Sequence, residues 1–290
     1  MTSQYPDPSY IILARGPWRP ADVITSYLPP SKSTPEIIAA AKRQREPALI
    51  AAAQRSSGHF FNGHVYGLQK FSKYKDDAGR SRLLLDFTSS NYFDMLCIDN
   101  ALDDSLEWRG RITTLRQELF GPHRQHVALS PHLVNCFGFG GLIVTSDNFA
   151  ILTRRASNLA VYSGHYTSSV AEGAAFPEDS ANGGGVDLLR MVSRGMKEEL
   201  ALDIRDPDVT FISLGMDPKN CSCFLVTLIN VSLTKREIQD QLRRNAPADG
   251  WEREELYFVS WDPESITDFM NNHTPWVSVT ILEALRHSFG

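Results

Sequence analysis

Apolar residues are grouped differently along the second half of the chain than along the first. From residue 136 onward, short apolar runs typical of strands alternate with segments whose apolar positions recur every three or four residues, as in helices. The predicted order is strand, strand, loop, helix, strand, strand, helix, strand and helix, over residues 136–145, 149–154, 162–179, 187–203, 209–216, 221–232, 234–245, 256–260 and 277–287. This order favours a mixed sheet lying between helices.

The helix expected over 187–203 has the clearest pattern. Asp187 is a good N-cap, and one face of the helix is apolar. The residues of that face are Leu188, Leu189, Val192, Met196 and Leu200. Residues 182–185, Asn-Gly-Gly-Gly, precede the helix. Their backbone N–H groups could hold a phosphate, but a flexible inserted loop is the favoured interpretation.

The first 130 residues predict a smaller α+β region. The expected elements are a strand at 10–13, a helix over 37–54 opened by residues 33–36, strands over 60–74 and 82–88, and a polar helix over 101–119. The remainder of 1–30 is expected to be loop. We therefore predict two parts: an N-terminal region, 1–130, that packs on a domain formed by 131–290.

Composition narrows the classes of partner. The chain has 290 residues and a formal net charge of -5, so it lacks the basic surplus that binding to duplex nucleic acid requires. We see no signal peptide and no apolar run near the roughly 20 residues that span a bilayer. The expectation is a cytoplasmic protein without a membrane partner, and the sequence leaves monomer and homodimer open.

Residues 194–202 contain the chemistry-bearing motif. They resemble the end of the Nudix box, Arg-Glu-aliphatic-x-Glu-Glu-x-Gly-aliphatic, with two departures: Gly195 stands for a Glu and Ala201 for a Gly. The matching residues are Arg194, Met196, Glu198, Glu199 and Leu202. Upstream, Glu172-Gly173 and Asp179 resemble the Gly-x5-acid loop of the box, and residues 180–185 are an insertion.

Three further segments resemble the Nudix pyrophosphatases that cleave UDP-glucose and UDP-galactose. They are residues 83–96, 144–155 and 252–259, and their order and spacing agree with that subfamily. The resemblance implies a Nudix α/β/α sandwich with a mixed sheet. It also implies Mg²⁺ (or Mn²⁺) as cofactor and a small nucleoside diphosphate derivative as substrate, most simply a UDP-sugar. The products would be a nucleoside monophosphate and a phosphorylated moiety.

Carboxylates suit this chemistry because Mg²⁺ prefers hard oxygen ligands. On a helix, positions 195 and 199 lie one turn apart on one face, and Arg194 can pair with Glu198 at i+4. Since Gly195 has no side chain, either catalysis is lost or another acid fills its place. Glu172, Glu178 and Asp179 are the loop candidates.

The resemblance and these spacings together assign the candidate site. The catalytic candidates are Glu199, Glu198, Arg194 and Glu252, the last preferred over Glu254 and Glu255 as the acid from a late loop. The metal candidates are Glu198, Glu199, Asp179, Glu178 and Glu172, and the substrate-binding candidates are Gly173, Arg154 and Arg155. Tyr92 and Phe93 open a helix and are interpreted as core residues rather than as a stacking surface for a base.

Two alternatives stay open. The first is a Nudix-fold binding or regulatory protein that holds a nucleotide without cleaving it, which Gly195 favours. The second is a biosynthetic enzyme that uses the same site on an unusual nucleotide or a prenyl diphosphate. Convergence of Glu198, Glu199 and one loop acid on a common point would favour hydrolysis.

Overall fold

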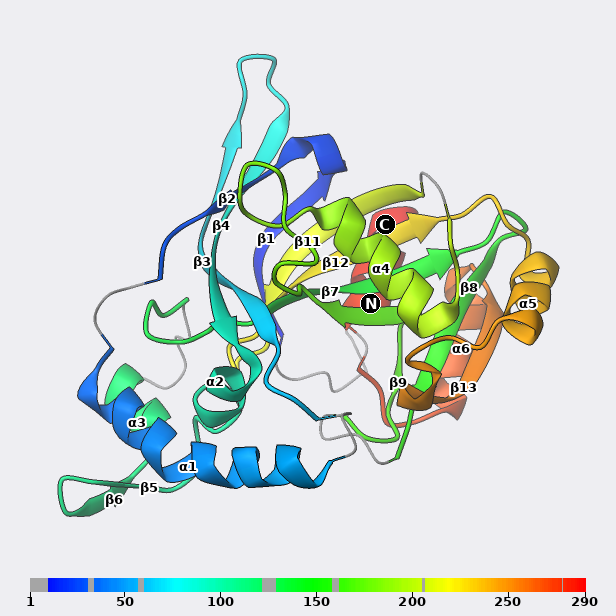
Figure 1. Ribbon diagram of the computed structural model, residues 1–290. Helices are drawn as coiled ribbons and strands as arrows, with labels where there is room; N and C mark the ends of the chain where they lie inside the picture. The colour runs from blue at the N-terminus through cyan, green and yellow to red at the C-terminus, as the bar shows by residue number, and fades with distance from the viewer. Residues whose placement is uncertain are drawn as a thin grey trace.

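A mixed eight-stranded sheet forms the centre of the molecule (Figure 1). The computed structural model describes residues 10–30, 34–56, 60–121, 129–157, 162–204, 207–277 and 279–290. The main path of the sheet is β1 (Ile11–Trp18), β11 (Asp208–Met216), β12 (Cys223–Asn230), β7 (Phe137–Val144), β8 (Phe149–Arg155) and β13 (Arg253–Ser260). Two short strands complete it: β9 (Tyr166–Thr167) pairs with β8, and β10 (Val170–Gly173) pairs with β7.

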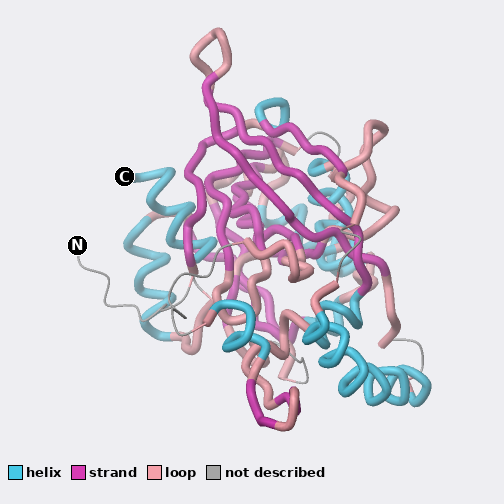
Figure 2. The backbone as a smooth tube through the Cα atoms, turned by 90° about the vertical axis from the view of Figure 1, so that its left-hand side faces the viewer, coloured by secondary structure: helices cyan, strands magenta, loops and turns pink. Residues whose placement is uncertain are grey.

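Helices cover both faces of this sheet. Helix α4 (Leu188–Leu200) packs on one face, while α6 (Pro263–Asn272) and α7 (Val279–Phe289) pack on the other (Figures 1 and 2). Neighbouring residues of β12 show the two faces: Leu225 belongs to the core cluster under α4, and Val226 belongs to the cluster under α6 and α7. Strands buried on both faces explain the unbroken apolar runs of the sequence. The predicted α/β fold with a mixed sheet between helices is confirmed.

The N-terminal part contributes a second, three-stranded sheet in the order β2 (Val23–Tyr27), β4 (Ser81–Asn91), β3 (His64–Lys75). Its other elements are α1 (Glu36–Arg55), α2 (Tyr92–Cys97), β5 (Leu106–Trp108), β6 (Arg111–Thr113) and α3 (Leu115–Phe120). The division at 130/131 stays a prediction, but β1 from the N-terminal part is an edge strand of the large sheet.

The helix predicted over 101–119 is wrong. Strands β5 and β6 form a hairpin there, and only α3 is helical. Arg109 and Gly110 connect the strands with φ of 49° and 75°, which closes a tight two-residue turn. Strand β2 was also expected to be loop; it pairs in parallel with β4.

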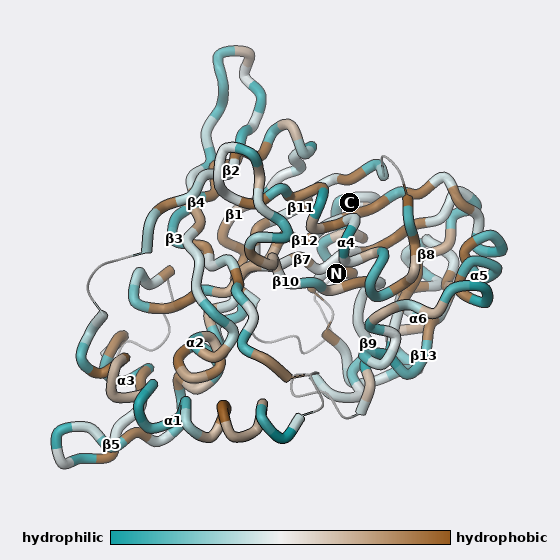
Figure 3. The backbone as a smooth tube through the Cα atoms, in the orientation of Figure 1, coloured by the Kyte–Doolittle hydropathy of each residue, from teal (hydrophilic) through white to brown (hydrophobic). Residues whose placement is uncertain are grey.

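Side chains cap the N-termini of helix α4 and of the helix that follows β12. The Asp187 side chain accepts a hydrogen bond from the Arg190 backbone N–H, and Thr234 and Glu237 form a capping box at α5 (Lys235–Arg244). Most of α5 is hydrophilic, in contrast to the apolar strands beside it (Figure 3). Of the predicted helix start at 33–36, residue 33 lies outside the described residues. Helix α1 begins at Glu36, after Pro35 and without a side-chain cap.

Residues 182–185, predicted to be a flexible inserted loop, form a turn that contacts the small sheet. Tyr66 Oη donates to the Gly185 carbonyl at 3.1 Å, and Thr25 Oγ1 donates to the Val186 carbonyl at 2.9 Å. Gly185 has a φ of 86°, and the backbone of β2 lies directly against its Cα. The insertion therefore joins the start of α4 to the N-terminal part. Within the described residues, no helix is long and apolar enough to cross a bilayer.

Candidate active site

Arg194 lies at the centre of the candidate site. Its Nε and Nη2 donate to the two oxygens of Asp179 at 3.1 and 2.7 Å, and its Nη1 donates to Glu198 at 2.8 Å. The same guanidinium donates to the Gly173 carbonyl at 2.6 Å and lies 3.3 Å from Glu172 Oε1. One side chain on α4 thus holds the loop between β10 and α4 in place and fixes Glu198 on its own helix.

Asp179 is completely buried, and both of its oxygens are engaged. Besides Arg194, its Oδ2 accepts a hydrogen bond from the Ala175 backbone N–H at 2.8 Å. Asp179 was predicted as a metal ligand; in the structure it positions Arg194 and closes the loop. Glu178, the neighbouring candidate, is exposed, and its carbonyl accepts a weak 3.4 Å hydrogen bond from Arg190.

Glu172 is the loop acid that lies over Gly195. A Cβ built on Gly195 would lie 2.9 Å from the Glu172 Cβ and 3.2 Å from its Cγ. Glu172 comes from β10, which the glycines of β7 allow to lie close: a Cβ on Gly138 would be 2.4 Å from the Glu172 carbonyl oxygen. Among the three acids proposed to replace a carboxylate at 195, the structure brings Glu172 to that point.

Burial and mutual repulsion raise the pKa values of three carboxyl groups here. Burial, followed by repulsion from Glu172 and Glu252, holds the pKa of Glu199 well above its usual range. Burial raises the pKa of Glu172 to about 7, against the opposing charge of Arg194. Burial also raises the pKa of Glu252, against Arg155. Burial therefore favours the neutral form of these carboxyl groups, and the nearby arginines oppose it.

The two arginines of β8, Arg154 and Arg155, lie in different environments. Arg155 lies within electrostatic range of Glu199 and Glu252, as expected of a residue at the site. Arg154, its neighbour on β8, instead pairs with Glu254 at 3.5 Å and lies over the Tyr166 ring. Because adjacent strand residues point to opposite faces, the substrate contact predicted for Arg154 lies away from the acid cluster.

Two residues that the sequence did not assign to the site lie beside it. Arg253, which is opposite Arg155 in register, acts electrostatically on Glu199, and its Nη1 is buried without a hydrogen-bond partner among the described residues. Tyr92 was interpreted as core; burial raises its pKa, and the nearby charge of Glu252 adds to this rise. Both residues lie within segments that resemble the subfamily, 83–96 and 252–259, which is the signal that could have indicated them.

The carboxyl groups of the site are the kind of ligand that a divalent cation prefers. Glu172, Glu198, Glu199 and Glu252 offer hard oxygen donors, so the donor set fits Mg²⁺ or Mn²⁺ in its chemistry. Over the described part of the chain, no three Asp, Glu, His or Cys side chains already converge as a metal site. Arg194 instead holds Glu172 and Glu198, so these two must turn away from it to share an ion.

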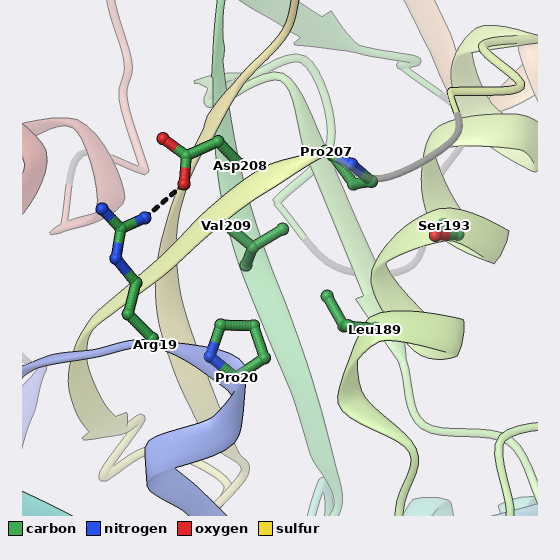
Figure 4. Close-up of a pocket in the computed structure, with 7 residues that line it drawn as sticks. All are labelled: Arg19, Pro20, Leu189, Ser193, Pro207, Asp208 and Val209. Atoms are coloured by element: carbon green, nitrogen blue, oxygen red, sulfur yellow. Dashed lines mark hydrogen bonds and ion pairs between the residues drawn. The ribbon is translucent and has the colours of Figure 1, made fainter.

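A separate cavity of about 260 Å³ lies beside α4 (Figure 4). It is lined by Arg19, Pro20, Leu189, Ser193, Pro207, Asp208 and Val209. Two of its lining residues, Arg19 and Asp208, form an ion pair. Its lining includes none of the predicted site residues.

Comparisons with known proteins give similarity of shape alone. No family model matches the chain, and no curated protein matches it. Among solved structures, DR0079 from Deinococcus radiodurans matches with a TM-score of 0.36 and 12% identity, over 53% of this chain and 83% of its own. A MutT protein from Methanosarcina mazei Go1 matches with a TM-score of 0.28 and 14% identity, over 47% and 91%. Similarity at this level carries no functional conclusion, and the fold assignment rests on the sheet and its helices.

Proposed function

We propose that this protein is a hydrolase of the Nudix type that cleaves the diphosphate of a nucleoside diphosphate derivative with Mg²⁺ or Mn²⁺. The observation that carries the proposal is the arrangement around Arg194. This residue fixes Glu198 beside a group of carboxylates whose pKa values are raised by burial and repulsion. Such perturbed acids in one place are typical of functional sites. The resemblance to the UDP-sugar pyrophosphatases supports a UDP-sugar as the substrate.

Each residue has a role in the proposed site. Glu198, Glu199 and Glu172 would hold the cation once Glu172 and Glu198 turn from Arg194 toward it. Asp179 would keep the Arg194 guanidinium in place. When bound, the cation supplies neutralisation of the phosphate oxygens and activation of the attacking water. Arg155 contributes a positive charge near Glu199 for the substrate phosphates.

The proposed reaction consumes one water. The water oxygen forms a bond to one phosphorus of the P–O–P bridge, and the bond between that phosphorus and the bridging oxygen breaks. Glu252 accepts a proton from the water, because its pKa is raised toward neutral pH, where a carboxylate is a stronger base. The bridging oxygen leaves with the other phosphate, so the products are two phosphomonoesters.

One observation favours the second candidate, a nucleotide-binding protein without hydrolysis. Arg194 already engages Glu172 and Glu198, and the described acids form no ready three-ligand group. In that case a nucleotide would bind through the same residues and dissociate unchanged.

A substrate panel separates the two candidates. The purified chain is incubated with Mg²⁺ or Mn²⁺ and with UDP-glucose, UDP-galactose, ADP-ribose, NAD, nucleoside triphosphates and prenyl diphosphates, and products are separated by ion-exchange chromatography. Hydrolase function predicts release of a mononucleotide from at least one nucleoside diphosphate derivative. Tight binding of one of these compounds without turnover of any would reject hydrolysis and support the binding protein.

A further inference from the structure

Gly195 lies in the buried interior of α4, where glycine is a poor residue. Glycine weakens a helix interior relative to alanine because it costs more backbone entropy on folding. Gly195 neither caps the helix nor carries a positive φ, so backbone conformation does not require it. The cause lies in the space around its Cα.

That space is filled by a side chain from another element. A Cβ at 195 would meet the Cβ and Cγ of Glu172 at 2.9 and 3.2 Å, and the Phe139 ring at 3.2 Å. Glu172 and Phe139 are register partners on β10 and β7, so the two strands place both side chains against α4 together. Any side chain at 195 would have to displace Glu172.

The carboxyl group of Glu172 faces the acids of α4. Its Oε1 lies 3.3 Å from Arg194 Nη1 and accepts a hydrogen bond from the Gly173 backbone N–H at 3.0 Å. On the next turn of the helix, Glu199 Oε1 accepts a hydrogen bond at 2.9 Å from the backbone N–H of Ala171, the residue before Glu172. A carboxylate therefore stands next to Glu199 on the face where a Glu at 195 would point, but it is supplied by the strand.

We propose that Gly195 and Glu172 form an exchanged pair, in which β10 supplies the cation-binding carboxylate that the helix lacks. This inference rests on the proposed function, since it assigns Glu172 as a ligand of the same site. In this pair, β10 supplies the carboxylate, and Gly195 leaves the space that the Glu172 side chain occupies. The two positions cannot both carry a Glu side chain without local displacement.

The steric part is tested by a double-mutant cycle read by thermal unfolding. In the wild type, Gly195→Ala should lower Tm, because the new methyl group meets Glu172. In a Glu172→Gly background, where two of the three close contacts are gone, Gly195→Ala should raise Tm by about 2–4 °C through better helix propensity. A decrease of the same size in both backgrounds would overturn the pairing.

The functional part is tested by Mn²⁺ binding, measured by electron paramagnetic resonance of free Mn²⁺ without any substrate. Glu172→Gly should weaken Mn²⁺ binding by about tenfold or more, and Gly195→Glu added to it should restore affinity to within about threefold of the wild type. Glu178→Ala, an exposed acid of the same loop, is the matched control and should bind as the wild type does. Cooperative unfolding of each variant shows that it is folded.

The outcomes distinguish this inference from the proposed function. Wild-type affinity in Glu172→Gly would overturn the role of Glu172 and leave the metal site itself standing. Failure of the folded double variant to regain affinity would overturn the exchange. Absence of Mn²⁺ binding by the wild type would overturn both the exchange and the proposed function, even if the Tm cycle shows the pairing.

Discussion

Asp179 has no access to solvent, and Arg194 donates to both of its carboxylate oxygens. Removing this carboxylate leaves a mostly buried guanidinium without its closest charged partner, a change that typically costs about 3–5 kcal/mol. We expect Asp179→Ala to lower the free energy of unfolding in urea by about 3 kcal/mol and to weaken cation binding as well. The exposed neighbour serves as the control, and Glu178→Ala should change stability by less than about 0.5 kcal/mol. Equal losses in the two variants would contradict the role given to Asp179.

A second residue, Glu172, makes the free energy of unfolding depend on pH. Its pKa is raised from 4.5 to about 7, so between these values the folded chain binds a proton that the unfolded chain has released. The free energy of unfolding should therefore fall as pH rises from 4.5 to 7. The shift corresponds to roughly 3 kcal/mol at most.

Urea unfolding in EDTA at pH 5 and pH 7.5 measures this effect. Wild type should lose stability relative to Glu172→Gln over this interval, and saturating Mg²⁺ should reduce the loss because the cation favours the ionised carboxylate. A constant difference between the two proteins across the interval would contradict the pKa of Glu172.

Helix α4 is the element that orders the site, and its start depends on a single cap. The Asp187 side chain accepts a hydrogen bond from the Arg190 N–H at 3.0 Å. Asp187→Ala should lower the free energy of unfolding by about 1 kcal/mol, and Asp187→Asn should lower it less because the acceptor remains. Equilibrium unfolding followed by circular dichroism measures both variants. Identical losses in the free energy of unfolding would show that the side-chain acceptor at 187 contributes nothing.

The sequence predicts a helix or strand correctly where residues close in the chain carry one clear pattern. Asp187 and the apolar spacing indicated α4, and the i+4 spacing indicated the contact between Arg194 and Glu198. The helix expected over 101–119 failed because Arg109 and Gly110 adopt left-handed φ and turn the chain. Polar composition gave no sign of that turn.

The contacts that define the site are not local, and this limited what the sequence could predict. Asp179 reaches Arg194 across 15 residues, and the sequence left it equivalent to Glu172 and Glu178. The position of Glu172 depends on Gly138, 34 residues earlier on another strand, which lets β10 approach β7. The roles of Glu172, Glu178 and Asp179 can therefore be distinguished only in the folded structure.

At the scale of the whole molecule, β1 joins the N-terminal part to the central sheet. Trp18 at its end is 1% exposed, lies opposite Phe211 of β11 and donates to Ser81 Oγ of β4 at 3.1 Å. Trp18→Ala should cost about 3–5 kcal/mol and shift one common transition in circular dichroism and fluorescence. Trp251→Ala, at 47% exposure, is the matched control with a small effect. Two separate transitions in Trp18→Ala would show that the parts unfold independently.

We propose that the carboxylates around Arg194 form a cation-dependent hydrolytic site. The most direct test is ³¹P nuclear magnetic resonance of UDP-glucose incubated with the wild type and with Glu199→Gln, each with Mg²⁺ and with EDTA. We expect the diphosphate signals of the wild-type reaction with Mg²⁺ to be replaced by two phosphomonoester signals, and we expect EDTA or Glu199→Gln to prevent this. Unchanged diphosphate with the wild type and Mg²⁺ would contradict the UDP-sugar assignment, and conversion by Glu199→Gln at the wild-type rate would contradict the site itself.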